Sequence, residues 1–211
     1  MEKIRYPRTL HLEWSEHLTT DDKIQTDLSY FEGKDIIITE KMDGENTTMY
    51  NSTIHARSLD SGHHPSRNYV KGIWGNIRHL IPDNFRICGE NMYAEHSIFY
   101  DNLEDYFLVF SIWENDICLN WNDTEEYCKL FNLHTVPILY EGKFDKNLLE
   151  NFHTTLDTTR QEGFVMRLKS SFKYSEFSKC VVKWVRKNHI TTDEHWMTKP
   201  VVKNKLKLVT K

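Results

Sequence analysis

The sequence predicts an α+β domain with largely antiparallel sheets around a central cleft. Segments rich in β-branched and aromatic residues outnumber amphipathic helical segments, and several of them adjoin through short turns. A chain of 211 residues, 39% of them hydrophobic, is long enough to bury one sizeable core. No repeat or Pro/Gly/Ser-rich linker divides the chain, so residues 1–211 are expected to form a single domain.

Six segments carry strand signals. The stretch "DLSYFEGKDIIITEK", residues 27–41, predicts a glycine turn into a buried strand that ends at a lysine. The stretch "NTTMYNSTIHARS", residues 46–58, alternates enough to predict a hairpin that turns near Asn51 and Ser52. Further strands are predicted from β-forming residues at 85–94, 106–114, 162–168 and 180–186.

Two segments carry helix signals. Residues 66–81 predict a helix that ends at Pro82. Its apolar residues recur at helical spacing: Tyr69, Val70, Ile73, Ile77 and Leu80. Residues 121–133 predict a second helix, with Asn122 or Asp123 as its N-cap.

Charge and hydropathy exclude two broad classes of protein. A net charge of -4 and a pI of 6.3 argue against a protein that coats nucleic acid by bulk electrostatics, although a local basic groove stays open. The mean hydropathy of -0.63 and the absence of a long apolar run predict no membrane association and a cytoplasmic location. Residues 197–211 carry five lysines and no acid, which is typical either of a solvated, frayed tail or of a phosphate-contacting arm.

The cysteines and histidines show no metal-ligand spacing. The cysteines are expected to be reduced, mostly buried thiols: Cys88, Cys118, Cys128 and Cys180. His63 and His64 lie in "GHHPSR" without a zinc-type pattern, so no structural transition-metal site is expected. This loop is either a passive surface loop or a phosphate-contacting one.

A possible nucleophile stands at the end of the first strand, in the sequence Lys41-Met42-Asp43-Gly44. A lysine amine attacks only when it is deprotonated, so such a site is expected to lower the lysine pKa by burial or by neighbouring positive charge. The glycine allows a phosphate to approach the backbone closely. By itself this short pattern is equally typical of a lysine at an ordinary β-turn.

Other charged residues interrupt apolar strands further along the chain. Glu90 lies in "CGENMYA", Glu162 begins "EGFVMRL", and Lys183 lies in "VVKWVR". Arg57 follows the predicted hairpin and is suited to binding phosphate. Each alone is compatible with a strand end or an edge strand facing solvent. Together with Lys41 they favour one shared site, because buried charges need partners.

The order of these motifs resembles the covalent nucleotidyltransferases, the superfamily of ATP-dependent RNA and DNA ligases and mRNA-capping guanylyltransferases. The longer strings "YPRTLHLEWS", "EKMDGENTTMY" and "IHARSLDSGHHPSR" are similar to a bacterial and phage RNA ligase family related to the Deinococcus-type RNA ligase. The resemblance covers roughly Thr39 to Lys187. It implies an ATP-grasp-like nucleotidyltransferase fold, the adenylation domain of DNA and RNA ligases, around a nucleotide cleft.

The resemblance also implies a reaction in three steps. Lys41 would attack ATP and form a lysyl-AMP adduct, AMP would pass to a 5′-phosphate end, and a 3′-hydroxyl would displace it. The substrates implied are ATP and RNA ends or a nicked duplex, and Mg²⁺ or Mn²⁺ would offset phosphate charge. The alternatives are a DNA nick ligase, a stand-alone nucleotidyltransferase, and a non-enzymatic nucleotide- or RNA-binding module.

The family motifs assign a role to each matching position. Among catalytic residues, Lys41 would be the nucleophile, Glu162 would organise the metal, and Lys183 would hold the α-phosphate. Glu90 would contact the ribose and the metal. The nucleotide-binding set is Glu40 and Lys41 beside adenine and the α-phosphate, Asn46 at the incoming 5′-phosphate, Arg57 at the ribose or a phosphate, Glu90, Phe110 stacked on adenine, Glu162 and Lys183.

Three points stay open within the resemblance. Phe107 and Trp113 are alternatives to Phe110 as the stacking ring. Many ligases carry a second cation in the last motif, and here it would be Lys179, Arg186 or Lys187. The sequence leaves no room for the accessory domain of many ligases, so the core is expected to seal poorly alone, to need a partner protein, or to use the lysine-rich tail as its clamp.

Overall fold

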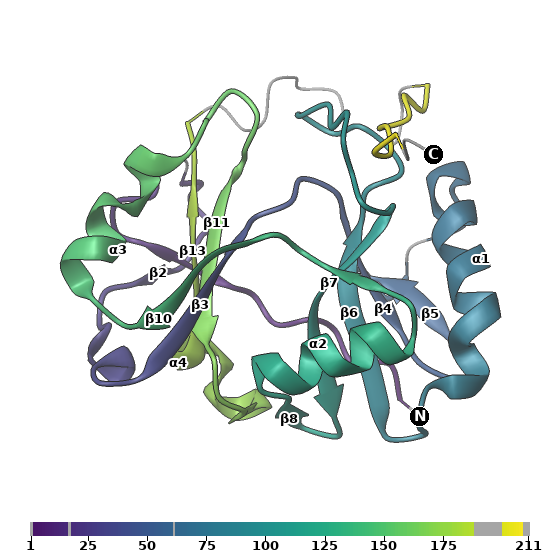
Figure 1. The fold of residues 1–211 in the computed structure, drawn as a ribbon, viewed down its shortest axis with the longest axis horizontal. Coiled ribbons are helices and arrows are strands. Elements are labelled where there is room, and N and C mark those ends of the chain that lie inside the picture. Colours follow the sequence, from purple (N-terminus) through teal and green to yellow (C-terminus); the bar gives the residue numbers. More distant parts are fainter. Residues whose placement is uncertain (1, 17, 61, 188–199, 209–211) are drawn as a thin grey trace.

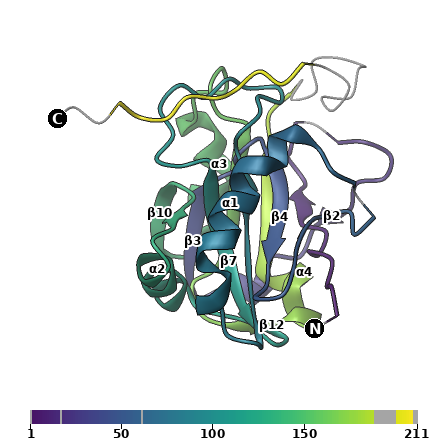
Figure 2. The same ribbon diagram turned by 90° about the vertical axis from the view of Figure 1, so that its right-hand side faces the viewer.

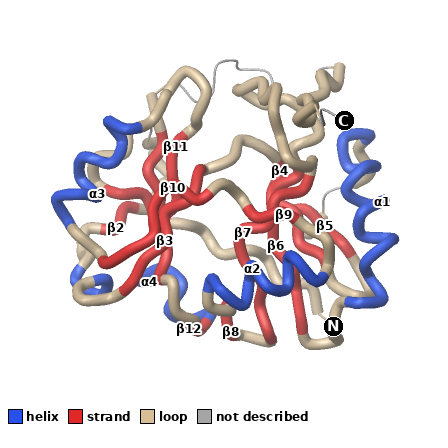
Figure 3. The backbone as a smooth tube through the Cα atoms, viewed as in Figure 1, coloured by secondary structure: helices blue, strands red, loops and turns tan. Residues whose placement is uncertain are grey.

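Two β-sheets, red in Figure 3, form the frame of the molecule. The computed structural model describes residues 2–16, 18–60, 62–187 and 200–208. The first sheet contains β1 (Leu10–Leu12), β2 (Ile24–Gln25), β3 (Asp35–Glu40), β10 (Ile138–Lys143), β11 (Gly163–Leu168) and β13 (Val181–Val185). The second contains β4 (Glu45–Met49), β5 (Ile54–Ala56), β6 (Phe85–Asn91), β7 (Phe107–Glu114), β8 (Ile117–Cys118), β9 (His134–Thr135) and β12 (Phe172–Lys173). The helices are α1 (Asn68–Ile77), α2 (Trp121–Leu130), α3 (Lys146–Phe152) and α4 (Phe177–Cys180).

Strand β3 is the central feature of the first sheet, whose order is β10-β3-β11-β13-β1-β2. Antiparallel neighbours flank it on both sides, and Ile36, Ile37 and Ile38 are 0% exposed. Gly33, with φ of 71°, makes the turn before the strand. The predicted glycine turn and buried strand are therefore confirmed.

The second sheet has the order β12-β8-β7-β6-β4-β5, and β9 pairs in parallel with β7. Strands β4 and β5 form the predicted antiparallel hairpin, and β6 pairs antiparallel with both β4 and β7. Most strand pairs are antiparallel, as predicted. The N-terminal strand β1 is an exception, because it runs parallel to both β13 and β2.

Helices α1 and α3 lie on the outer sides of the two sheets. Figures 1 and 2 show α1 along the outer face of the second sheet and α3 beside the first. Val70 and Ile77 of α1 pack in a hydrophobic cluster with residues of the second sheet, whereas Leu149 and Phe152 of α3 pack in a cluster that contains residues of both sheets. The space between the sheets is thereby left for a cleft.

Some predicted details of the helices are wrong. The helix predicted over residues 66–81 is α1 at Asn68–Ile77, flanked by the short 3-10 helices Pro65–Arg67 and Arg78–Leu80, and Tyr69 and Leu80 are 38% and 49% exposed. The N-cap of α2 is Asn120, whose side chain accepts from the main-chain N–H of Asp123, so neither Asn122 nor Asp123 caps the helix. Strand β10 and helix α3 were not predicted.

All cysteines of the sequence are buried free thiols, in agreement with the prediction. Among the residues that the structure describes, no helix has the length and apolar character needed to cross a membrane.

Candidate active site

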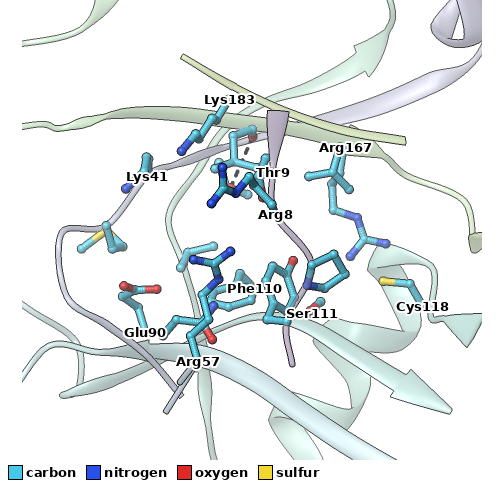
Figure 4. A pocket seen from close by; sticks show the side chains of 18 of the residues that line it. Arg8, Thr9, Lys41, Arg57, Glu90, Phe110, Ser111, Cys118, Arg167 and Lys183 are labelled. Carbon is cyan, nitrogen blue, oxygen red and sulfur yellow. Dashed lines mark hydrogen bonds between the residues drawn. The ribbon is translucent and has the colours of Figure 1, made fainter. Parts of the chain in front are cut away.

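A cleft between the two sheets is lined by side chains from both (Figure 4). Strands β3, β11 and β13 contribute from the first sheet, and β4, β6 and β7 contribute from the second. The cleft brings together seven of the eight residues predicted to bind nucleotide: Glu40, Lys41, Asn46, Arg57, Glu90, Phe110 and Lys183. The eighth, Glu162, is connected to the cleft by an ion pair with Lys41.

Lys41 directly follows the last residue of β3, where main-chain hydrogen bonds fix the strand end. The N–H of Lys41 donates to the carbonyl of Gly163 at 2.9 Å, and the N–H of Glu40 donates to the carbonyl of Pro137 at 2.9 Å. The backbone is therefore held from both neighbouring segments. Such anchoring defines the direction in which the lysine side chain enters the cleft.

The turn after Lys41 is fixed by the loop that joins β6 to β7, residues 92–106. The Asp43 carboxylate accepts from the Ser97 N–H at 2.7 Å, the Ser97 hydroxyl at 2.6 Å and the Ile98 N–H at 3.0 Å. A Cβ atom on Gly44 would lie 2.6 Å from the Asn91 carbonyl oxygen, closer than real contacts allow. Asp43 and Gly44 thus serve the packing of the turn in this state.

Lys41 Nζ lies 2.5 Å from Glu162 Oε2, and the Glu162 side chain is only 4% exposed. Burial lowers the pKa of Lys41, but Glu162, Glu90 and Asp43 outweigh it, so the pKa is raised above its ordinary value. The expectation of a lowered lysine pKa is therefore wrong for this state of the protein. A reaction at Lys41 needs its proton removed, and Glu162 is the group in contact with it.

Glu90 and Glu162 together place two buried carboxyl groups near Lys41. Burial, with smaller effects of Glu162 and Asp43, raises the pKa of Glu90 to about 8, although Lys41 acts in the opposite direction. Burial also raises the pKa of Glu162. Two such carboxylates suit a hard divalent cation that completes its shell with phosphate oxygens and water. Among the described residues no group of three or more His, Cys, Asp or Glu could hold a metal by itself.

Lys183 on β13 of the first sheet and Arg57, which follows β5 of the second, supply further positive charge to the cleft. Burial, with a contribution from Lys41, lowers the pKa of Lys183 to about 8. Burial and the nearby Arg5 and Arg8 lower the pKa of Arg57. Neither Lys183 nor Arg57 has an ion-pair partner within the described ranges. An anionic ligand would relieve this concentration of charge.

Phe110 is the aromatic residue of β7 that lines the cleft, and Val165 of β11 lines it as well. The alternatives Phe107 and Trp113 are 0% exposed and belong to the two separate cores. Tyr6 packs edge-on against Phe110 at 5.0 Å between ring centroids. A half-buried aromatic face with an aliphatic residue nearby is suited to a flat base.

None of the three candidates for a second cation of the last motif lines the cleft. Side chains alternate along a strand, so Trp184 and Arg186 point away from the face that carries Lys183. Lys179 lies on α4, and Lys187 is exposed beyond the end of β13. Sequence reasoning missed two lining cations, Arg8 and Arg167, of which the buried Arg167 donates to the carbonyls of Leu119 and Leu168.

The N-terminal segment, residues 6–9, forms part of the cleft wall, as does Asp22. Sequence reasoning did not identify this wall. The three-residue strand β1 is too short for a periodicity signal, and its pairing with β13 joins distant parts of the chain. The only local sign was the position of Arg8 in "YPRTLHL", two residues before Leu10.

Residues 200–207, here called the C-terminal strap, are docked on the 92–106 loop. Asn204 is 0% exposed; its side chain donates to the carbonyl of Met92 at 2.8 Å and accepts from the N–H of Tyr100 at 2.9 Å. Lys203 Nζ lies over the rings of Tyr93 and Tyr106. A frayed tail is therefore the wrong interpretation for residues 202–207. Residues 197–199 and 209–211 of the predicted tail lie outside the described residues.

The two histidines of the "GHHPSR" loop do not line the cleft. The N–H of Ser66 donates to His64 Nδ1 at 3.3 Å, at the start of the short 3-10 helix Pro65–Arg67. His63 Nε2 lies 3.1 Å from Asn68 Oδ1. These contacts indicate that both residues order the entry to α1.

Comparisons with known proteins agree with this geometry. A family model described as RNA ligase matches residues 34–185. Among solved structures, an archaeal ATP-dependent RNA ligase has a TM-score of 0.56 at 17% identity, over 86% of this chain and 48% of that chain. A putative ATP-dependent DNA ligase from Aquifex aeolicus has a TM-score of 0.54 at 16% identity, over 92% of this chain and 56% of that chain.

A mutant of the Naegleria gruberi RNA ligase with AMP and Mn has a TM-score of 0.54 at 16% identity, over 78% of this chain and 53% of that chain. No curated protein matches the sequence. The chain spans about half the length of the solved structures it resembles. At these identities the likeness shows the fold, and the predicted α+β ligase adenylation fold is confirmed.

Proposed function

The chain belongs to the RNA ligase family, and from this premise we propose that it is an ATP-dependent RNA ligase that joins 5′-phosphate and 3′-hydroxyl ends. The observation that carries the proposal is the Lys41–Glu162 pair at the end of a fixed strand, inside a cleft with uncompensated cations and a half-buried aromatic ring. Residues 1–211 would act as one adenylyltransferase domain.

In the first step Lys41 Nζ gives up a proton to Glu162 and attacks the α-phosphorus of ATP. A nitrogen–phosphorus bond forms, the bond to the β-phosphate oxygen breaks, and pyrophosphate leaves. Lys183 would hold the α-phosphate oxygens as charge moves onto the leaving group. The 5′-phosphate of an RNA end then takes AMP from Lys41, and a 3′-hydroxyl displaces AMP.

The remaining cleft residues would hold the nucleotide. Phe110 would stack on adenine, and Glu40 would lie at the edge of the base. Arg57 would bind the ribose or a phosphate, and Asn46, opposite Glu90 in the β4–β6 register, would meet the incoming 5′-phosphate. These roles are supported by the shared cleft and by the charges of the groups.

A divalent ion fits the two buried carboxylates described above. Glu90 and Glu162 would hold Mg²⁺ or Mn²⁺ together with phosphate oxygens. Bound there, the ion supplies positive charge that offsets the charge of the phosphates.

The deciding measurement is the intact mass of the protein after incubation with ATP and Mg²⁺. We expect a gain of about 329 Da, one AMP, in the wild type and none in Lys41→Ala. Lys143→Ala removes an exposed lysine from the neighbouring strand β10 and should keep the adduct. Prior treatment with pyrophosphate, followed by its removal, strips any AMP already on the protein. A folded wild-type protein that forms no adduct would contradict the ligase proposal and favour a non-enzymatic nucleotide- or RNA-binding module.

Nicked duplexes then separate the candidate substrates. A strand with a ribose 3′-hydroxyl should be joined faster than its deoxyribose counterpart. Equal or faster joining of the deoxyribose strand would favour a DNA nick ligase, and an adduct without any joining would favour a stand-alone nucleotidyltransferase. If joining appears only after cell extract is added, an accessory partner is required.

A further inference from the structure

The mouth of the cleft carries more positive charge than a single α-phosphate needs. Arg8, Arg57 and Lys183 come from three separate chain segments and line the same cleft. Figure 4 shows the side chains of Arg8 and Arg57 pointing into the space that Lys183 also faces. No carboxylate lies within ion-pair distance of these three residues in the part of the chain that the structure describes.

Arg8 is carried to this position by a fixed piece of backbone. It precedes β1, whose pairing with β13 places His11 opposite Lys183. Leu12 is 0% and His11 is 2% exposed, so β1 is anchored in the interior. Arg8 itself donates through Nη1 to the carbonyl of Asp21, which orients the guanidinium. The rest of this planar donor group is available to a ligand.

The cations are brought together at an energetic cost. Like charges in a partly buried cleft repel each other, and the nearby Arg5 adds to the field at Arg57. The rest of the fold must hold these cations together against their electrostatic repulsion. A polyanion that enters the cleft removes this repulsion, and the gain contributes to its binding free energy. Two guanidinium groups and an ammonium group match phosphate groups better than any other common ligand.

From this juxtaposition we propose that Arg8 is a phosphate-binding residue of the cleft and forms, with Arg57 and Lys183, a site for phosphate beyond the α-phosphate. Arg8 thereby takes the place of the second cation that the last motif lacks. Two sources share this chemistry: the terminal phosphates of ATP, and the 5′-phosphate of an RNA end. The inference rests on the proposed function for the choice between them, but the phosphate site itself can be tested without catalysis.

The first experiment measures binding alone. Inorganic pyrophosphate should raise the Tm of the wild type, and Arg8→Ala should bind it at least about tenfold more weakly, since the lost hydrogen bonds are charge-assisted. Arg78→Ala is the matched control, because Arg78 is exposed on the far side of the second sheet and also donates to one main-chain carbonyl. Equal pyrophosphate affinity in Arg8→Ala and wild type overturns the inference, whether or not the protein forms an AMP adduct.

The second experiment separates the two sources. If Arg8 binds the terminal phosphates of ATP, Arg8→Ala slows adduct formation about tenfold, while AMP passes from preformed lysyl-AMP to a 5′-phosphorylated RNA at the wild-type rate. If Arg8 binds the RNA 5′-phosphate, the transfer is slowed and adduct formation is not. Arg8→Lys keeps the positive charge but lacks the paired N–H donors of the guanidinium. Whichever step Arg8→Ala slows should be slowed less in Arg8→Lys. Wild-type rates in both steps with a normal Tm would refute the assignment.

Discussion

At the scale of single residues, the charge of Lys183 decides how the cleft meets a phosphate. The pKa of this lysine is lowered to about 8, so it is protonated and cationic below that pH and loses its charge as the pH rises through it. AMP has no pyrophosphate leaving group, so Lys41 cannot form the adduct from it, and AMP is therefore a clean binding probe. We expect the affinity of the wild type for AMP to fall roughly tenfold between pH 7 and pH 9.5, measured by calorimetry.

Lys183→Arg provides the control for this prediction. Arginine keeps its charge throughout the range, so the variant should lose much less affinity with rising pH. Glu90 also gains negative charge near pH 8 and would repel AMP. An unchanged pH dependence in Lys183→Arg would therefore assign the effect to Glu90 and contradict the role given to Lys183.

Glu90 makes a separate prediction about stability. Its folded-state pKa of about 8 lies above the ordinary value of 4.5, so the folded protein binds a proton that the unfolded chain has released between these pH values. This contribution to stability is full below pH 4.5 and is lost as the pH rises through 8. Glu90→Gln does not titrate, and its Tm relative to wild type should therefore rise by at least about 3 °C from pH 4.5 to pH 8.5. A difference in Tm that stays constant over this pH range would show that folding does not raise the pKa of Glu90.

At the scale of elements, the C-terminal strap supports the nucleophile through a relay of hydrogen bonds. Asn204 holds the N–H of Tyr100, and the hydroxyl of Tyr100 accepts from the main-chain N–H of Asp43 at 3.1 Å. The same loop binds the Asp43 carboxylate through Ser97 and Ile98. The turn that follows Lys41 is therefore fixed by a segment far away in the sequence.

Asn204→Ala should loosen this relay. The substitution leaves the buried carbonyl of Met92 and the N–H of Tyr100 without their partner, at a cost of about 2 to 3 kcal/mol locally. We expect faster amide hydrogen exchange in the 92–106 loop and a several-fold slower formation of the AMP adduct with an unchanged KM for ATP. Lys207→Ala removes an exposed ion pair between Lys207 of the strap and Glu104 of the 92–106 loop. This variant should change neither the hydrogen exchange nor the adduct rate. A slower exchange rate or a normal adduct rate in Asn204→Ala would contradict the relay.

The sequence predicted the elements whose own residues carry the signal, and missed those defined by distant pairing. Strand β3 is predicted by its three consecutive isoleucines, and the charged residues of β6 and β13 are recognised because they interrupt apolar runs. Strand β1 has three residues, so nothing local distinguishes it from a loop. The part of the cleft that it carries, including Arg8, becomes visible only once β13 has been placed beside it. Asn204 was hidden for the same reason, because its partners lie around a hundred residues earlier.

At the scale of the whole molecule, the nucleotide is expected to act as a bridge between the sheets. Lys41, Val165 and Lys183 are held by the first sheet, whereas Glu90 and Phe110 are held by the second. Two hydrophobic clusters already join the sheets: one contains Ile36 of β3 and Trp113 of β7, and another contains Ile37 of β3 and Leu108 of β7. A ligand that contacts both walls should therefore stabilise both sheets together, more than it would by binding to either alone.

Amide hydrogen exchange with saturating AMP measures this coupling. We expect protection to increase in β3, β11 and β13 and also in β6 and β7, since opening either sheet would release the ligand. The amides of α1, on the outer side of the second sheet, should be protected less (Figure 2). In Phe110→Ala the protection of β6 and β7 should fall while that of β3 persists. Protection confined to the first sheet in the wild type would show that AMP binds without closing the cleft, and would leave Phe110 as a core residue.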